Sequence, residues 1–148
     1  MRALLQRTTE ASVRIGDVAV ASIGPGLMIL VGVSHADDPD VADALARRVT
    51  ELRIFRDAEG RTNLSLNDVR GEVLVVSQFT LFADTSRGRR PGFTAAAPPE
   101  QAERLYERFV AALREHDVHV ETGRFGAEMA VSLVNDGPFT IWLDTDDR

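Results

Sequence analysis

The chain has 148 residues, 44% of them hydrophobic, and a formal net charge of −6. It contains no cysteine and no lysine, which excludes disulfides, thiol nucleophiles, cysteine-ligated metals, a P-loop and Schiff-base chemistry. The negative charge argues against a broad nucleic-acid-binding face, although a local arginine cluster at residues 87–90 could grip a short nucleic-acid end. No segment approaches the roughly 18 apolar residues of a membrane span.

The first part of the chain predicts strands. Residues 3–15 alternate between apolar and polar side chains and lead through a turn at residues 16–17 into a return strand over residues 18–23. Gly24-Pro25-Gly26 has the residue pattern of a type II turn. Residues 27–33 are continuously apolar, which predicts a strand buried on both faces. No apolar segment follows the two arginines of residues 1–9, so we expect no signal peptide and cytoplasmic residence.

A helix is predicted next. Asp38 is expected to cap it and Pro39 to occupy its first position. Its apolar face recurs at Val41, Leu45, Val49 and Leu52. Residues 56–71, rich in Gly, Asn, Asp and Ser, predict a loop.

The second half predicts a strand over residues 72–78 and a long connection over residues 83–97, which is often functional at that length. A second helix is predicted from Pro98-Pro99-Glu100, with an apolar face formed by Ala102, Leu105, Tyr106, Phe109, Val110 and Leu113. Three short strands then follow over residues 118–122, 130–134 and 139–143, and residues 144–148 are expected to fray. The elements predict a mixed, mostly β-sheet covered by two helices.

Two polar segments are candidates for chemistry. Ser77-Gln78-Phe79-Thr80 ends an apolar strand, and Asn135-Asp136-Gly137-Pro138 lies between two apolar runs. The first would present hydroxyl, amide and backbone donors, and the second predicts a rigid turn, so together they suggest a small-molecule or acyl site. An ordinary strand end and an ordinary β-turn remain open alternatives. Ser77 and Thr80 could be nucleophiles, but a hydroxyl needs a neighbouring base and none is evident.

The remaining candidates are weaker. His116 and His119 fall where the second helix should end, so we interpret them as solvated side chains and predict no metal and no cofactor. Arg87, Arg89 and Arg90 are equally consistent with a phosphate-binding loop and with a solvated one.

With their contexts, these segments resemble the bacterial and eukaryotic D-aminoacyl-tRNA deacylases, nearly from end to end. The residues that carry the resemblance are Arg2-Ala3-Leu4-Leu5-Gln6-Arg7, Ala11-Ser12-Val13, Arg53-Ile54-Phe55, Asp57-Ala58-Glu59-Gly60, Asn63-Leu64, Val75-Val76-Ser77-Gln78-Phe79-Thr80-Leu81, Arg87-Gly88, Arg90-Pro91, Phe93, Thr122-Gly123-Arg124-Phe125, Met129 and Val131-Ser132-Leu133-Val134-Asn135-Asp136-Gly137-Pro138. Phe139 stands where the family more often has valine, and Arg89 where it varies.

The resemblance implies a homodimer that hydrolyses the ester between a D-amino acid, or glycine, and the 3′-terminal adenosine of tRNA. It implies catalytic roles for Ser77, Gln78, Phe79 and Thr80, substrate and chiral selection by Asn135, Gly137, Pro138, Arg7 and Met129, and tRNA contacts at Arg87, Arg89 and Arg90. It further implies a cis Gly137-Pro138 peptide that enters the partner's pocket and is locked by Arg7. The expected fold is α/β (α+β), a single domain over residues 1–148 with a mixed, mostly antiparallel, barrel-like sheet covered by two helices.

Two other function classes stay open on the sequence alone. A non-catalytic tRNA-end or nucleotide-binding dimer would use the same pocket without turnover. A conventional esterase with Thr80 as nucleophile would form an acyl-enzyme and accept small esters without RNA.

Overall fold

The structure is a computed structural model that describes residues 1–147. Its elements, in chain order, are β1 (Arg2–Ile15), β2 (Val18–Ile23), β3 (Gly26–Gly32), α1 (Pro39–Glu51), β4 (Phe55–Arg56), β5 (Thr62–Leu64), β6 (Glu72–Ser77), the 3-10 helix η1 (Phe79–Phe82), α2 (Pro99–Glu115), β7 (His119–Thr122) and β8 (Ala130–Asp144).

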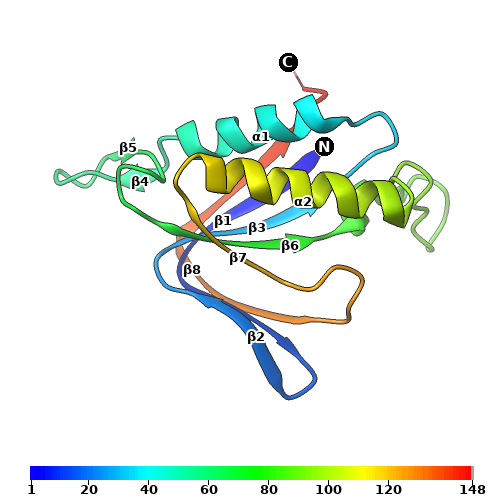
Figure 1. The fold of residues 1–148 in the computed structure, drawn as a ribbon, viewed down its shortest axis with the longest axis horizontal. Coiled ribbons are helices and arrows are strands. Elements are labelled where there is room, and N and C mark those ends of the chain that lie inside the picture. Colours follow the sequence, from blue (N-terminus) through cyan, green and yellow to red (C-terminus); the bar gives the residue numbers. More distant parts are fainter. Residues whose placement is uncertain (148) are drawn as a thin grey trace.

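The main sheet is organised around β1. One edge of β1 pairs antiparallel with β8 from Arg2 to Arg14, and the other edge pairs first with β3 and then with β2. Beyond β3 the sheet continues through β6 and β7, which are parallel to their neighbours. β2 also contacts β6 and β7, so the sheet curls towards closure (Figure 1). The predicted mixed, barrel-like sheet with two helices is confirmed.

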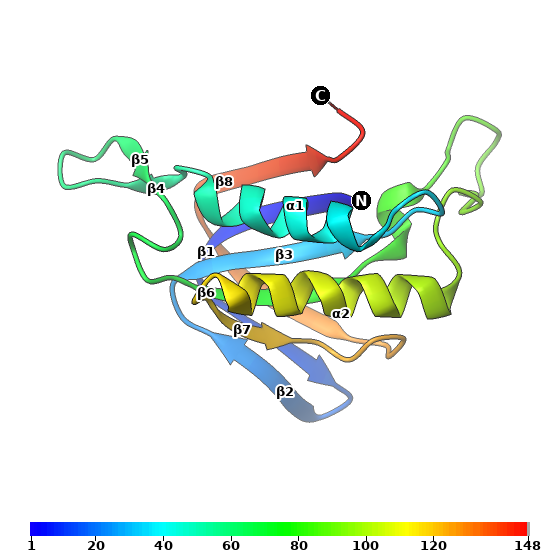
Figure 2. The same ribbon diagram turned by 45° about the horizontal axis from the view of Figure 1, so that its top comes forward.

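The two helices lie side by side over one face of the sheet (Figures 1 and 2). Asp38 caps α1 by accepting a hydrogen bond from the Val41 N–H at 2.9 Å, as predicted. The predicted apolar face of α2 is buried throughout and consists of Ala102, Leu105, Tyr106, Phe109, Val110 and Leu113. A second apolar cluster, which includes Val13, Met28 and Leu74, fills the other face. Because both faces are covered, β3 and β6 are almost continuously apolar.

Two predicted loops differ from the structure. Gly26 begins β3 and does not adopt the positive φ that a type II turn requires. Its lack of a side chain serves packing instead, because a Cβ there would lie 1.8 Å from the Glu72 carbonyl oxygen.

Residues 56–71 are not a plain loop, since β4 and β5 form a small hairpin there. Asp57 holds its turn by accepting hydrogen bonds from the backbone N–H groups of Glu59 and Arg61.

The prediction of separate strands over residues 130–134 and 139–143 is wrong. β8 runs continuously from Ala130 to Asp144, and Gly137-Pro138 lies in a bulge within it. The prediction that the chain frays from residue 144 is also wrong for residues 144 and 145. Asp144 is buried and pairs with Arg2, and the Thr145 N–H donates to the Met1 carbonyl oxygen at 3.0 Å. Arg148 lies outside the described residues. Neither helix of the described chain is long and apolar enough to cross a membrane.

Candidate active site

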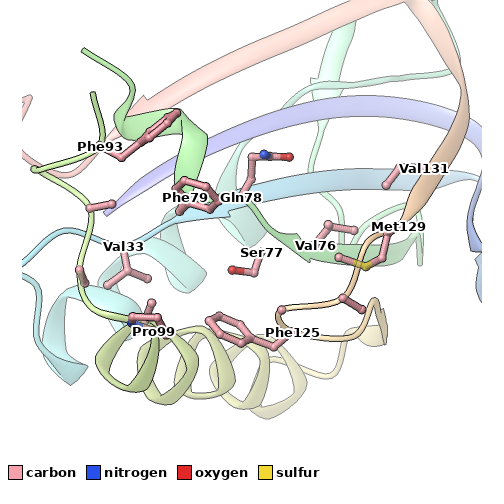
Figure 3. Close-up of a pocket in the computed structure, with 15 residues that line it drawn as sticks. Val33, Val76, Ser77, Gln78, Phe79, Phe93, Pro99, Phe125, Met129 and Val131 are labelled. Carbon is pink, nitrogen blue, oxygen red and sulfur yellow. The ribbon is translucent and has the colours of Figure 1, made fainter. Parts of the chain in front are cut away.

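A cavity of about 570 Å³ opens where β6 ends, between η1, the start of α2 and the loop that precedes β8 (Figure 3). Its lining is mainly apolar and consists of Val33, Val76, Ser77, Gln78, Phe79, Phe93, Ala96, Ala97, Pro99, Ala102, Phe125, Gly126, Ala127, Met129 and Val131. A concave apolar site with a few convergent polar groups is the usual form of a small-molecule site.

The end of β6 brings the predicted polar segment to this cavity. Ser77 pairs with Val31 of β3, and the Gln78 N–H donates to the Val31 carbonyl oxygen at 2.7 Å. The chain then turns sharply into η1. Gly32 permits this turn, because a Cβ there would lie 3.0 Å from the Gln78 carbonyl oxygen and 3.1 Å from the Phe82 ring. Ser77, Gln78 and Phe79 therefore line the cavity.

Thr80 lies one residue beyond the lining. Its hydroxyl accepts a hydrogen bond from Gln78 Nε2. Among residues 1–147, no histidine or carboxylate side chain is hydrogen-bonded to Thr80 or to Ser77. Within the part of the chain that the structure describes, neither hydroxyl has the adjacent base that activates a nucleophile.

Two aromatic side chains that the sequence did not assign to the site, Phe93 and Phe125, complete the cavity. Phe79 is 54% exposed and packs edge-on against Phe93, with ring centres 4.9 Å apart. Phe93 belongs to the long connection, which Asp84 and Gly92 close by exchanging two backbone hydrogen bonds of 2.8 Å. In the sequence, the signal for Phe93 is that it is the one aromatic residue in this connection.

The opposite wall is the segment 123–129, which carries Phe125 and Met129. It is anchored to β6, because the Gly123 N–H donates to the Val75 carbonyl oxygen at 3.1 Å. The Tyr106 hydroxyl of α2 donates to the same oxygen at 2.9 Å. Burial raises the pKa of Tyr106 to about 12, so the hydroxyl remains a donor even at the alkaline pH where an ordinary tyrosine ionises. This anchor holds the wall against the strand that carries Ser77.

The second predicted segment forms a separate cluster around Arg7. The Arg7 side chain is 3% exposed and donates to the carbonyl oxygens of Ile54 at 2.7 Å and Asp136 at 3.1 Å. Asn135 closes the bulge, since its Oδ1 accepts from the Phe139 N–H at 2.8 Å. The Gly137-Pro138 peptide is cis, and both residues are exposed.

Within one chain these two clusters do not meet. Arg7 pairs with Leu27 of β3, whereas Ser77 pairs with Val31. Four residues along a strand span roughly 13 Å, and the three strand spacings from β8 to β6 span roughly 14 Å. The cavity therefore holds Ser77, Gln78, Phe79 and Met129, but not Gly137 or Pro138.

The other candidates lie apart from both clusters. Arg87, Arg89 and Arg90 are exposed in the connection that projects beyond α2, at the opposite end of the molecule from the β4–β5 hairpin (Figures 1 and 2). His116 follows the end of α2, and His119 is exposed beside Glu121. In the described part of the chain, no three His, Asp or Glu side chains are grouped to hold a metal ion.

Comparison with known proteins identifies relatives along the whole chain. The profile of a family described as D-Tyr-tRNA(Tyr) deacylase matches residues 4–144. A protein of Dinoroseobacter shibae named D-aminoacyl-tRNA deacylase is 66% identical and covers 97% of this chain and 99% of its own length. A protein of the same name from Paracoccus denitrificans is 55% identical, with coverages of 100% and 99%.

Solved structures agree with these relatives. One titled c-Myc DNA Unwinding Element Binding Protein has a TM-score of 0.91 at 39% identity and covers 97% of this chain and 98% of its own. A probable eukaryotic D-amino acid tRNA deacylase shares the fold, with a TM-score of 0.81 at 21% identity and coverages of 96% and 97%.

Proposed function

The chain belongs to the D-Tyr-tRNA(Tyr) deacylase family, and we propose that it hydrolyses the ester joining a D-amino acid, or glycine, to the 3′-terminal adenosine of tRNA. The products are the free amino acid and tRNA, so the enzyme is a hydrolase of carboxylic esters. It acts in translation proofreading, and we place it in the cytoplasm with its tRNA substrate.

The observation that carries the proposal is the exposed Gly137-Pro138 step on a bulge held by a buried arginine. Arg7 joins the bulge to the body of the domain, because it donates both to the Asp136 carbonyl oxygen in the bulge and to the Ile54 carbonyl oxygen outside it. Held in this way, the bulge can serve as a rigid wall. We propose that its backbone carbonyls hold the substrate amino group and leave no room for an L side chain, which is discrimination by exclusion.

The wall needs a second copy of the chain. The cavity of the same chain lies at the end of β6, whereas Gly137-Pro138 lies in β8. The proposed site is therefore completed by the Gly137-Pro138 step of a second copy. The outer edge of β8 favours such an assembly, because among residues 1–147 β8 pairs only with β1, and it carries Val134 and Trp142, which are 49% and 44% exposed. Unpaired edges with exposed apolar side chains are typical of interfaces.

The cavity can support the chemistry without a side-chain base. The first N–H groups of a helical turn have no carbonyl partner inside the turn, and at η1 these belong to Phe79 and Thr80. We propose that they stabilise the tetrahedral oxyanion, usually the largest single catalytic contribution. The ribose 2′-hydroxyl beside the ester then helps to position or activate the attacking water.

The test of the activity is deacylation of matched D-Tyr-tRNA and L-Tyr-tRNA by the purified protein. We expect rapid release of D-tyrosine and little release of L-tyrosine. Binding without turnover would favour a non-catalytic tRNA-end-binding dimer. An acyl adduct on Thr80 in mass spectrometry during turnover would favour the conventional esterase.

The test of the assembly is sedimentation at micromolar concentration. Val134→Arg and Trp142→Arg should yield a folded monomer that has lost deacylation. The matched control is Val18→Arg on β2, because Val18 is 64% exposed and lies off this edge. A wild-type monomer with full activity would rule out the cross-subunit wall.

A further inference from the structure

Sulfur is scarce in this chain and unevenly exposed. The sequence has no cysteine and three methionines, all within the described residues. Met1 and Met28 are 1% and 2% exposed, whereas Met129 is half-buried and lines the cavity. A small solute in the cavity therefore reaches the Met129 side chain without any unfolding, and it does not reach the other two methionines.

The Met129 sulfur is closely packed on one side. Its Sδ accepts a hydrogen bond from the Arg124 N–H at 3.4 Å. A Cβ on Gly123 would lie 2.6 Å from the same Sδ, so the sulfur rests directly against the loop backbone. Figure 3 shows the side chain reaching from the start of β8 towards Val76 along the cavity wall. Additional volume at Sδ has space towards the cavity and none towards Gly123.

Oxidation by a peroxide adds an oxygen atom to Met129 Sδ and so increases the volume of the side chain at that position. A lone pair of Sδ forms the new sulfur–oxygen bond, the peroxide oxygen–oxygen bond breaks, and water leaves. The sulfur loses two electrons and the peroxide gains them. The product sulfoxide is polar and is reduced again by methionine sulfoxide reductases with a thiol. Its oxygen either displaces the Arg124 contact or enters an apolar cavity, where an unpaired polar group is costly.

We propose that Met129 is a reversible oxidation site whose sulfoxide obstructs the substrate cavity. The proposal rests on the proposed function, because it takes this cavity to be where the aminoacyl end binds. Access does not depend on the oligomeric state. Any opening that admits an aminoacyl adenosine also admits hydrogen peroxide, including in a dimer whose partner covers part of the cavity.

The experiment treats the purified full-length protein with graded hydrogen peroxide. Peptide mass spectrometry measures the oxidised fraction at Met129 and Met28, and deacylation of D-Tyr-tRNA is followed in parallel. We expect Met129 to be oxidised much faster than Met28. The value of kcat/KM should fall in proportion to the Met129 sulfoxide, by about tenfold at completion. MsrA and MsrB with dithiothreitol should restore it.

Two variants make the test specific. Met28→Leu should lose activity in peroxide as the wild type does, and peroxide should not change the activity of Met129→Leu, whatever its starting level. Equal oxidation of Met28 and Met129, or complete Met129 sulfoxide with unchanged kcat/KM, would overturn the proposal. If the untreated protein does not hydrolyse D-Tyr-tRNA, the proposed function fails. Binding of a non-hydrolysable D-aminoacyl-adenosine before and after oxidation then decides the role of Met129.

Discussion

The guanidinium carbon of Arg7 lies 4.6 Å from the centre of the Phe139 ring. A buried cation is thus stacked on the strand that carries Gly137-Pro138, while its N–H groups bind carbonyl oxygens on either side. Arg7 contacts the bulge through the Asp136 backbone and through the Phe139 ring. Both contacts restrain the exposed step that we propose as the chiral wall.

Phe139→Leu should therefore loosen the wall while keeping an apolar side chain. The cation–π contact is lost from a desolvated site, and we expect the free energy of unfolding to fall by about 1 to 3 kcal/mol. Discrimination between D-Tyr-tRNA and L-Tyr-tRNA should fall as well. Urea denaturation and paired deacylation assays measure the two effects. Ile141→Leu, on the same strand, is the matched control. Unchanged discrimination would show that the stacking has no role in selectivity.

Gly137→Ala should reduce hydrolysis of D-Tyr-tRNA or relax chirality. Gly137 has φ +134°, a conformation that favours glycine, and a Cβ would lie 3.0 Å from Arg7 Nη2. Gly16→Ala is the control, since Gly16 also has a positive φ, +58°, but among the described residues no atom beyond its two chain neighbours lies within 4 Å of an added Cβ. That variant should lose some stability and keep its activity. Equal effects of the two substitutions on discrimination would contradict the role of Gly137.

Local patterns predicted most of the fold. The period of α2 identified its buried face, and the continuous apolar runs identified the strands covered on both sides. The same reasoning failed at β8, because a Gly-Pro step between apolar runs is typical of a turn. The structure instead accommodates it as a bulge opposite Arg7. Whether this step becomes a turn or a bulge depends on the pairing of β8 with β1, which lies more than a hundred residues away in the sequence. The local sequence does not contain that pairing.

Of the residues that line the cavity, local sequence patterns pointed to some and not to others. Ser77, Gln78 and Phe79 share one strand end, so a local pattern revealed them. Phe93 and Phe125 reach the cavity from distant loops, through tertiary contacts that no spacing rule describes. The distance between the cavity and Gly137 likewise depends on the register between strands, which the local sequence does not specify.

In the Asp144→Asn variant, the free energy of unfolding should depend less on pH in the acid range than it does in the wild type. Burial alone would raise the pKa of Asp144, but the Asp146 N–H and the Arg2 guanidinium outweigh it and hold the pKa below its ordinary value of 3.8. A lowered pKa stabilises the fold above pH 3.8, and that stabilisation is lost as the pH falls through the folded-state pKa.

At pH 7 the Asp144→Asn variant should unfold more easily by about 1 kcal/mol, and the difference should vanish in strong acid. Denaturant titrations between neutral and acid pH measure this, with the exposed Asp147→Asn as control. A constant difference at every pH would mean that the Asp144 charge is not responsible.

Replacing Arg87, Arg89 and Arg90 together with alanine should weaken tRNA binding and flatten its dependence on salt. Guanidinium groups pair well with phosphates, and each lost phosphate contact reduces the salt slope. Affinity measured over a range of salt concentrations tests this. Arg47→Ala, on the exposed side of α1, is the control for removing an arginine outside this loop. If the triple variant has the wild-type slope, these arginines do not contact the phosphates.

The last prediction concerns the chemistry. The Thr80 hydroxyl has a glutamine amide as its neighbour, and an unassisted hydroxyl is a weak nucleophile. Thr80→Ala should therefore retain substantial activity. A tRNA ending in 2′-deoxyadenosine and charged on its 3′-oxygen should bind normally yet turn over far more slowly, because it lacks the hydroxyl that we propose assists the attacking water. Single-turnover rates for both substrates on wild type and variant separate binding from chemistry. If the deoxy substrate is cleaved at the normal rate and Thr80→Ala is inactive, Thr80 is the nucleophile and substrate assistance is wrong.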